Sequence, residues 1–219
     1  MSINKSVKLR NRLVAPRKKG ARFIVFEGID GAGVEVQTKL LLNYLKRYKK
    51  NIERLYYPDY NGPIGKLIHE YLHNKYDFSV DVQFLLYFTD FFKDKEKIEE
   101  WLREDKTIIC DRYFTSAIAY QGLRGFPIER ALKFAKLFRL PEPDLIFFLK
   151  ISPETSIKRK NKEKQNLDRN EADKKFLIKL AKFYERIIRK QIFSRWIVID
   201  GEKSIDNVFK QIKSRLKIE

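Results

Sequence analysis

A short apolar run that ends in a glycine-rich turn constrains the fold of this chain more than any other sequence feature. Residues 23–26 read Phe-Ile-Val-Phe, a run typical of a buried parallel strand. The turn Gly28–Gly33 follows, and apolar residues then recur at helical spacing between Val36 and Leu45. The sequence therefore predicts a strand, a turn and a helix. In that arrangement the turn presents backbone N–H groups at the positive end of the helix, where they can bind phosphate.

Further strand-like runs alternate with helical periodicity along the rest of the chain. We predict strands at 52–57, 107–110, 145–149 and 196–199, and helices at 64–72, 80–103, around Ser116, and at 128–138, 153–163, 172–190 and 205–216. Such alternation requires a parallel sheet covered by helices on both faces. The predicted fold is therefore α/β: a three-layer sandwich with a five-stranded parallel sheet, forming a single domain over residues 21–217. Its ligands should bind beyond the carboxyl ends of the strands.

The chain carries a large positive charge, with a formal net value of +18 for 219 residues. Residues 1–20 contain seven Lys or Arg and no acidic residue, so we expect a basic N-terminal tail. Two interpretations stay open: attraction to a polyanionic partner, nucleic acid included, or a solvated lysine-rich surface. We find no ordered alternation of basic and aromatic residues that would favour nucleic-acid binding.

Hydropathy and cysteine content indicate a compartment. No run approaches the roughly 20 consecutive apolar residues needed to cross a bilayer, so we expect no membrane association. Cys110 is the only cysteine, which excludes an intramolecular disulfide framework and fits a reducing environment. The sequence therefore favours a cytoplasmic protein.

The glycine-rich turn departs from the standard phosphate-binding motif at two positions. That motif reads G-x-x-x-x-G-K-[ST], whereas Val34 and Glu35 stand here at the Lys and Ser/Thr positions. Val34 offers no cation, and Glu35 brings a negative charge towards a polyanion, a repulsion on the order of several kcal/mol unless a metal intervenes. Glu35 could instead ligate Mg²⁺, because carboxylates are good Mg²⁺ ligands. The alternative is a structural turn that binds triphosphate poorly.

From about residue 22 to residue 210 the sequence resembles the thymidylate kinase family. The twelve residues Asp111–Gly122 are similar to its D-R-Y-x-x-S-x-x-A-Y-Q-G signature, and residues 26–33 look like its opening motif up to the missing Lys. Gln37, Pro143–Leu145, Leu167–Glu171 and Asp200–Ile205 add shorter similarities. The resemblance implies a P-loop NTPase-type fold with a small lid at about 155–172. It also implies transfer of the ATP γ-phosphoryl group to dTMP, or a related pyrimidine monophosphate, giving dTDP and ADP with Mg²⁺ as cofactor. A homodimer through residues 80–103 would follow the family.

On the matching positions the resemblance implies a role for each of several residues. The cations that steady the transferred group would be Arg112, Arg159, Lys160 and Arg169. ATP would bind at Gly28, Ile29, Asp30, Gly31, Ala32, Gly33, Val34, Glu35 and Lys203. The dTMP site would comprise Asp30, Pro58, Asp59, Tyr87, Arg112, Tyr120 and Gln121. The metal would be held by Asp30, Glu35 and Asp111.

Three phosphate-binding cations that are usual in the family are absent together. Val34, Tyr56 and Phe91 stand where the family has Lys, Arg and Arg. The basic residues near 158–169 could deliver compensating charge from a closing lid, or could be a solvated charge run. Two main hypotheses follow: a working, atypical nucleoside-monophosphate kinase, or a catalytically impaired nucleotide-binding paralogue. A polyanion-binding protein is a third.

Overall fold

The computed structural model describes residues 20–48, 51–163, 168–171 and 173–216. Five strands form one parallel sheet in the order β2-β3-β1-β4-β5. The strands are β1 (Arg22–Glu27), β2 (Ile52–Tyr56), β3 (Thr107–Asp111), β4 (Leu145–Lys150) and β5 (Trp196–Asp200). The three central strands are almost entirely buried, as expected for parallel strands that are covered on both faces. The predicted five-stranded parallel sheet is confirmed.

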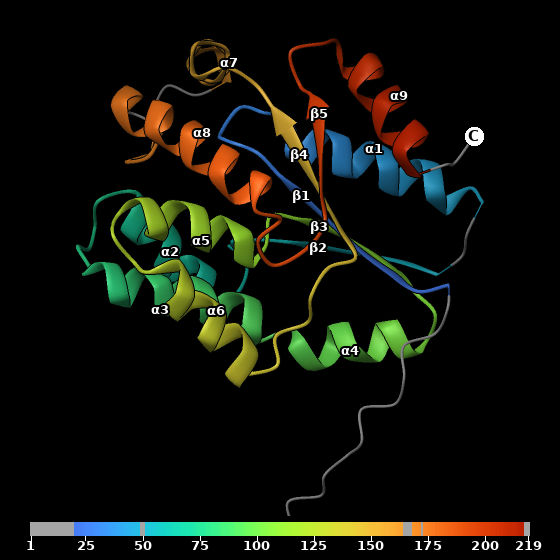
Figure 1. The fold of residues 1–219 in the computed structure, drawn as a ribbon, viewed down its shortest axis with the longest axis horizontal. Helices are drawn as coiled ribbons and strands as arrows, with labels where there is room; N and C mark the ends of the chain where they lie inside the picture. Colours follow the sequence, from blue (N-terminus) through green and yellow to red (C-terminus); the bar gives the residue numbers. More distant parts are fainter. Residues whose placement is uncertain (1–19, 49–50, 164–167, 172, 217–219) are drawn as a thin grey trace, which may run out of the picture.

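Helices cover both faces of this sheet (Figure 1). On one side lie α1 (Val34–Lys46) and α9 (Ile205–Leu216), which pack against each other. The other side carries α3, α5, α6 and α8. Their bounds, with those of the remaining helices, are α2 (Pro63–Leu72), α3 (Val80–Phe92), α4 (Lys95–Arg103), α5 (Phe114–Leu123), α6 (Ile128–Leu137), α7 (Pro153–Glu163) and α8 (Lys174–Arg189). The glycine-rich turn connects β1 in the sheet to α1 in one of the helical layers.

The helix predicted over residues 80–103 is two helices, and that prediction is corrected. The break follows Phe92, where the Lys93 ammonium lies 2.7 Å from the Asp94 carboxylate and 3.3 Å from that of Asp59. Asp94 also accepts a hydrogen bond of 2.9 Å from the Tyr57 hydroxyl. These contacts tie the break to the end of β2. Hydrophobic periodicity continues across a turn of this kind, so the pattern alone does not reveal it.

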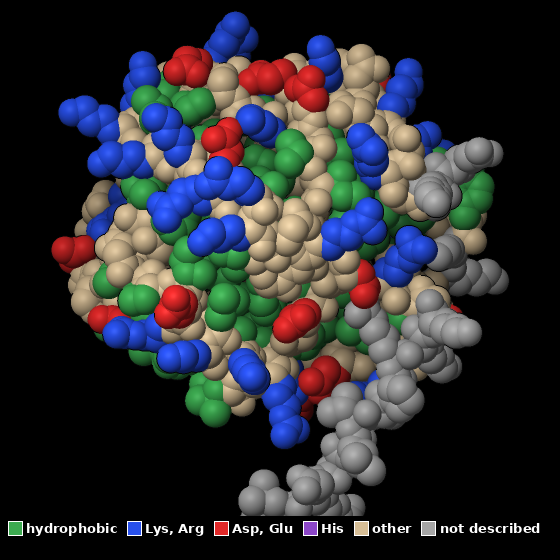
Figure 2. Space-filling view, viewed as in Figure 1, with side chains coloured by type: hydrophobic (Ala, Val, Ile, Leu, Met, Phe, Trp, Pro, Cys, Tyr) green, Lys and Arg blue, Asp and Glu red, His purple; other side chains and the backbone are tan. Residues whose placement is uncertain are grey.

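Basic side chains are spread over the face seen in Figure 2, with acidic side chains among them, rather than gathered into one patch. The predicted basic tail lies outside the described residues except for Gly20. Of the predicted lid, α7 and residues 168–171 are described, whereas 164–167 and 172 fall outside. Among the described helices, none combines the length and apolarity needed to cross a membrane.

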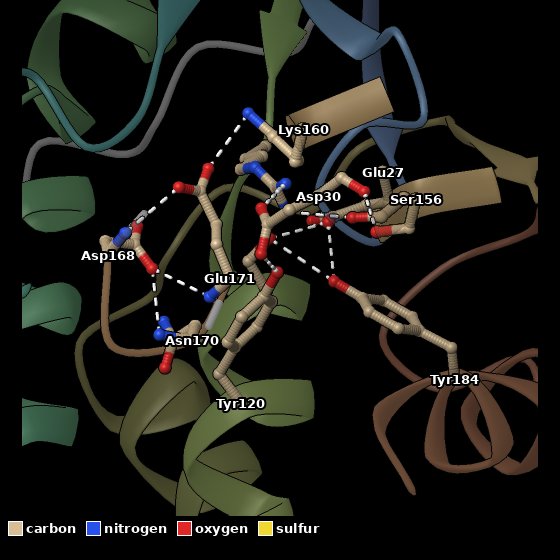
Figure 3. A network of polar contacts seen from close by, with 12 residues as sticks. Glu27, Asp30, Tyr120, Ser156, Lys160, Asp168, Asn170, Glu171 and Tyr184 are labelled. Carbon is tan, nitrogen blue, oxygen red and sulfur yellow. Dashed lines mark hydrogen bonds and ion pairs between the residues drawn. The ribbon is translucent and has the colours of Figure 1, made fainter. Parts of the chain in front are cut away.

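One buried carboxylate ties β1 to the helices beside it. Glu27, the last residue of β1, is fully buried and accepts hydrogen bonds from the hydroxyls of Thr115 (2.6 Å), Ser116 (2.6 Å) and Tyr184 (3.0 Å). It also accepts the backbone N–H of Tyr113 at 3.2 Å. Burial raises the pKa of Glu27. This network holds the start of α5 and the middle of α8 against the end of β1. Figure 3 shows Tyr184 of α8 directed at Glu27.

Candidate active site

Three hollows surround the glycine-rich turn at the carboxyl ends of the strands. We name them the loop cavity, the aromatic pocket and the outer groove. The loop cavity is lined by Ile29–Val36, Arg54, Tyr56–Pro58, Tyr60, Asp111, Arg112, Lys160, Asp168 and Glu171. The aromatic pocket is lined by Asp30, Tyr57, Pro58, Tyr60, Leu72, Tyr87, Phe91, Arg112, Ser116, Tyr120, Gln121, Asp168 and Asn170. The outer groove is lined by Gly31–Gly33, Val36, Gln37, Arg159, Gly201, Lys203–Ile205 and Val208.

The glycine-rich turn has the backbone geometry that its sequence predicts. Gly31 and Gly33 have φ of 78° and 83°, in the left-handed region that glycine enters without a steric penalty. A Cβ at Gly31 would lie 3.0 Å from the Ser156 carbonyl oxygen of α7. Gly33 is the N-cap of α1, and no side chain caps it. The first N–H groups of α1 are therefore left for a ligand.

The side chains at the two altered positions of the turn differ in burial. Val34 is buried at the start of α1. Glu35 is largely exposed, and its carboxylate lies 2.6 Å from the Lys39 ammonium one helical turn later. The hydrogen bond from Lys39 lowers the pKa of Glu35. Glu35 therefore pairs along the helix surface, which weakens its repulsion of a phosphate, and α1 contributes no cation to the loop cavity from its first turn.

Asp30 and Arg112 join the turn to the β3–α5 connection. The Arg112 guanidinium lies 2.7 Å from the Asp30 carboxylate and donates to the Gly28 carbonyl at 2.9 Å. The Tyr120 hydroxyl donates to the second Asp30 oxygen at 2.9 Å (Figure 3). Arg112 has φ of 61°, an unusual backbone conformation for a residue with a Cβ. Both Asp30 and Arg112 line the loop cavity and the aromatic pocket, so they stand between the two.

The cations predicted for the lid lie in three different places. Lys160 lines the loop cavity and pairs with Glu171 at 2.9 Å. Arg159 lines the outer groove and donates to the carbonyls of Gly31 (3.1 Å) and Gly201 (3.0 Å).

Arg169 lies outside all three linings as the described residues define them. Its guanidinium pairs with Asp77 at 3.1 Å, donates to the Tyr76 carbonyl and packs over the Tyr71 ring at 4.1 Å. The structure therefore does not bring Arg169 to the glycine-rich turn.

The aromatic pocket collects most of the residues predicted to hold a nucleobase. Pro58, Tyr87, Tyr120 and Gln121 all line it. The Gln121 side-chain oxygen is buried and has no hydrogen-bond partner among the described residues, so it is available to a ligand. Asp59 does not line the pocket: its carboxylate lies beside Lys93, as described above. A flat base would meet aromatic faces and one unpaired amide oxygen here.

Lys203 belongs to the outer groove, on the far side of the turn from the aromatic pocket. Its side chain is exposed and lies 3.8 Å from Asp200. Gln37, in the same groove, donates to the Ile205 carbonyl at 3.0 Å and leaves its own oxygen without a partner among the described residues. The groove therefore offers a second polar position next to the loop.

Carboxylates line the loop cavity without forming a metal site by themselves. Within the described part of the chain, no group of three or more His, Cys, Asp or Glu side chains could hold a metal ion. Asp30 is engaged by Arg112 and Tyr120, and Glu35 by Lys39. Asp111 ends β3 in the cavity, and burial raises its pKa to about 6. This donor set fits Mg²⁺, which is commonly held by one or two carboxylates together with substrate phosphates.

Several lining residues were not among those predicted from the sequence. Arg54 and Tyr60 come from β2 and the connection after it, while Asp168 and Asn170 come from the segment before α8. Period-2 alternation along β2 could have placed Arg54 on the same strand face as Tyr56. The resemblance places residues 168–170 at the end of the lid, but it does not indicate that Asp168 and Asn170 line the aromatic pocket.

A glycine-rich turn between β1 and α1 of a parallel sheet fits a P-loop NTPase-type α/β protein. Comparison with known proteins narrows the class. A family model described as Thymidylate kinase matches residues 26–212. The thymidylate kinase of Dictyostelium discoideum is 31% identical over 197 residues, covering 90% of this chain and 85% of that protein. The probable thymidylate kinase of Methanocaldococcus jannaschii is 34% identical, covering 89% and 95%.

A solved structure agrees with the sequence matches. The thymidylate kinase from Candida albicans superposes with a TM-score of 0.73 at 27% sequence identity, covering 90% of this chain and 91% of that one. The chain belongs to the thymidylate kinase family. The expected fold and the resemblance are both confirmed.

Proposed function

We propose that the chain transfers the γ-phosphoryl group of ATP to dTMP, giving dTDP and ADP. The observation that carries the proposal is the position of Arg112. Its guanidinium stands between the aromatic pocket and the loop cavity, held by Asp30 and the Gly28 carbonyl. A monophosphate with its base in the pocket would bring its phosphate to this guanidinium, which matches phosphate geometry.

The two substrates would approach the turn from opposite sides. The thymine of dTMP would lie against Tyr87 in the aromatic pocket, with the Gln121 amide at its edge. ATP would place its base and sugar in the outer groove near Lys203 and lay its phosphates along Gly28–Gly33. An oxygen of the dTMP phosphate would then attack the γ-phosphorus, and the bond from that phosphorus to the β–γ bridging oxygen would break.

The cations and the metal would stabilise this transfer. Arg112 would bind the acceptor phosphate, and Lys160 would exchange Glu171 for the transferred phosphoryl group. Arg159 would keep the turn aligned with the outer groove. Mg²⁺, held by Asp111 and phosphate oxygens, would neutralise charge on the donor. Because phosphoryl transfer depends on positioning and positive charge, no protein nucleophile is required.

The proposal also covers the oligomeric state, the compartment and the lid of the chain. The chain would act as a homodimer through α3, where Val82 and Leu85 are 40% and 45% exposed. It would work in the cytoplasm. The segment at about 155–172 would close over the phosphates as a lid, with α7 carrying Arg159 and Lys160.

Measurement of ADP formation with Mg²⁺-ATP tests the proposal across a panel of nucleoside monophosphates. We expect turnover with dTMP well above that with purine monophosphates. Binding of dTMP with no turnover of any acceptor would instead support the impaired nucleotide-binding paralogue. Turnover restricted to a purine monophosphate would contradict the acceptor assignment.

A further inference from the structure

The loop cavity contains one cation that is poorly engaged. Among the described residues three cations line it: Arg54, Arg112 and Lys160. Arg112 and Lys160 make short ion pairs of 2.7 and 2.9 Å. The ion pair from Arg54 to Asp111 is long, at 4.0 Å. In addition, the Arg54 Nε atom is buried and has no hydrogen-bond partner among the described residues.

Arg54 lies on β2, and it lines the same cavity as the glycine-rich turn. Arg54 pairs with Ile109 of β3, and Tyr56 pairs with Asp111, in the parallel register. Residues two apart on a strand project from the same face, and both Arg54 and Tyr56 line the loop cavity. The Arg54 guanidinium lies 5.5 Å from the Tyr56 ring centre. Its side chain is 24% exposed, so it is sheltered from bulk water yet open to the cavity.

The residues after Arg54 connect this cation to the acceptor side of the site. Tyr57, Pro58 and Tyr60 continue from β2 and line both the loop cavity and the aromatic pocket. A ligand whose base occupies the aromatic pocket would therefore extend its phosphate along this segment towards Arg54. The guanidinium presents a planar fork of N–H donors that matches two phosphate oxygens.

We propose that Arg54 binds the phosphate of the acceptor nucleotide in the loop cavity, where α1 provides no cation. The inference rests on the proposed function, because it takes a nucleoside monophosphate as the acceptor. A bound phosphate would accept a hydrogen bond from the unpaired Nε–H of Arg54. It would also give the guanidinium a closer charged partner than Asp111. Arg54 and Arg112 would then hold the acceptor phosphate from β2 and from the β3–α5 connection.

Binding of dTMP and of thymidine to Arg54→Ala separates this role from a structural one. We expect the dTMP dissociation constant to rise about 10- to 100-fold, the worth of hydrogen bonds to a charged group. Thymidine has no phosphate, so its dissociation constant should stay the same. Arg54→Lys keeps the charge but loses the fork, and should give an intermediate loss for dTMP. If Arg54→Ala does not fold, the same comparison on Arg54→Lys decides the question.

A second variant returns the guanidinium to the cavity from another position. Arg54→Ala combined with Tyr56→Arg moves the guanidinium two residues along one strand face. Tyr56→Arg in the otherwise wild-type chain is the reference, because Tyr56 stands where the family has a phosphate-binding Arg. A phosphate-binding role for Arg54 predicts that Tyr56→Arg raises dTMP affinity more in the Arg54→Ala background than in the wild-type background. A role limited to holding Asp111 predicts equal gains in both backgrounds. Arg130→Ala is the matched control, since Arg130 also pairs with a carboxylate, Asp81, but lies outside the cavity. It should leave both affinities unchanged.

The outcomes separate the inference from the proposed function. Wild-type turnover of dTMP with unchanged dTMP binding in Arg54→Ala overturns the role of Arg54 alone. Equal losses for dTMP and thymidine overturn it as well, because they indicate a structural role. Weakening confined to ATP also contradicts the acceptor assignment. A wild-type chain that binds no dTMP contradicts the proposed function and the inference together.

Discussion

The two sides of the glycine-rich turn differ in how completely their polar groups are organised. On the β3–α5 side, an ion pair and a hydrogen bond join Asp30 to Arg112 and Tyr120. The buried Glu27 fixes the start of α5, the helix that carries Tyr120. On the α1 side, Val34 is buried and Glu35 pairs with Lys39 along the helix surface. The proposed acceptor side thus holds its charged groups in place, whereas the proposed donor side offers backbone N–H groups. Charge for the phosphates must come from across the cavity.

Removing Glu27 should break the organised side most severely. Glu27→Ala leaves three hydroxyls and one backbone N–H without their acceptor in a fully buried site. We expect a loss of about 3–5 kcal/mol in the free energy of unfolding, measured by chemical denaturation.

Glu27→Gln is the matched control for that measurement. The amide keeps the shape and most hydrogen bonds, so a loss of only about 1 kcal/mol is expected. Burial raises the pKa of Glu27 above its ordinary value of 4.5, so the folded state binds this proton more strongly than the unfolded state. Stability contributed by this group should therefore fall as pH rises from 4.5 through the folded-state pKa, and Glu27→Gln should lack that dependence. Equal stability of the two variants would contradict the role of the network.

Arg112→Ala should produce the largest effect on catalysis. The loss of a preorganised charge between the aromatic pocket and the loop cavity is expected to lower kcat/KM for dTMP roughly 100- to 1000-fold. The free energy of unfolding should fall by less than in Glu27→Ala, because other contacts hold β3 and α5. Steady-state kinetics with Arg112→Lys as the comparison would show whether the planar fork matters beyond its charge. Undiminished turnover would remove Arg112 from the site.

Restoring the standard motif should strengthen nucleotide binding on the α1 side of the turn. Val34→Lys combined with Glu35→Ser restores the standard motif and should raise Mg²⁺-ATP affinity about tenfold, with dTMP affinity unchanged. Calorimetry with each nucleotide provides the measurement. If Glu35 has instead become a Mg²⁺ ligand when ATP is bound, the same change will lower both ATP affinity and turnover, and the description of a charge-poor donor side will be wrong.

The smallest expected effect concerns the Tyr120 hydroxyl. Tyr120→Phe removes one hydrogen bond to Asp30 while keeping the ring in the aromatic pocket. The expected loss is about 1 kcal/mol, or several-fold in kcat/KM for dTMP. Tyr48→Phe is a suitable control, because Tyr48 is 70% exposed and belongs to none of the three linings. A loss as large as that of Arg112→Ala would show that Tyr120 has a further role.

The parts of the molecule that the sequence predicts best are those governed by short-range patterns. The strand, turn and helix around Gly28–Gly33 follow from apolar periodicity and glycine spacing, and the sheet follows from the alternation of elements. The break between α3 and α4 was missed, because it depends on contacts of Lys93 and Asp94 with the end of β2. Helical periodicity does not register such contacts.

In the candidate site, too, short-range patterns predict some residues, whereas tertiary contacts determine the position of others. Asp30, Arg112 and Tyr120 were predicted together and meet in space, since one turn and one signature segment carry all three. Arg169 was predicted beside them, yet it pairs with Asp77 and packs on Tyr71. Arg54 was missed, because a single charge in an edge strand resembles an ordinary solvated residue. The direction of a long cationic side chain depends on tertiary partners that spacing does not reveal.

We expect a glycine-rich turn without its usual cation still to support phosphoryl transfer to dTMP. The most direct test follows ATP labelled at the γ-phosphate, mixed with dTMP, Mg²⁺ and the wild-type chain. We expect the label to appear in the terminal phosphate of dTDP, and Arg112→Ala to abolish most of this transfer. Label that stays in ATP, or that is released only as inorganic phosphate, would contradict this expectation.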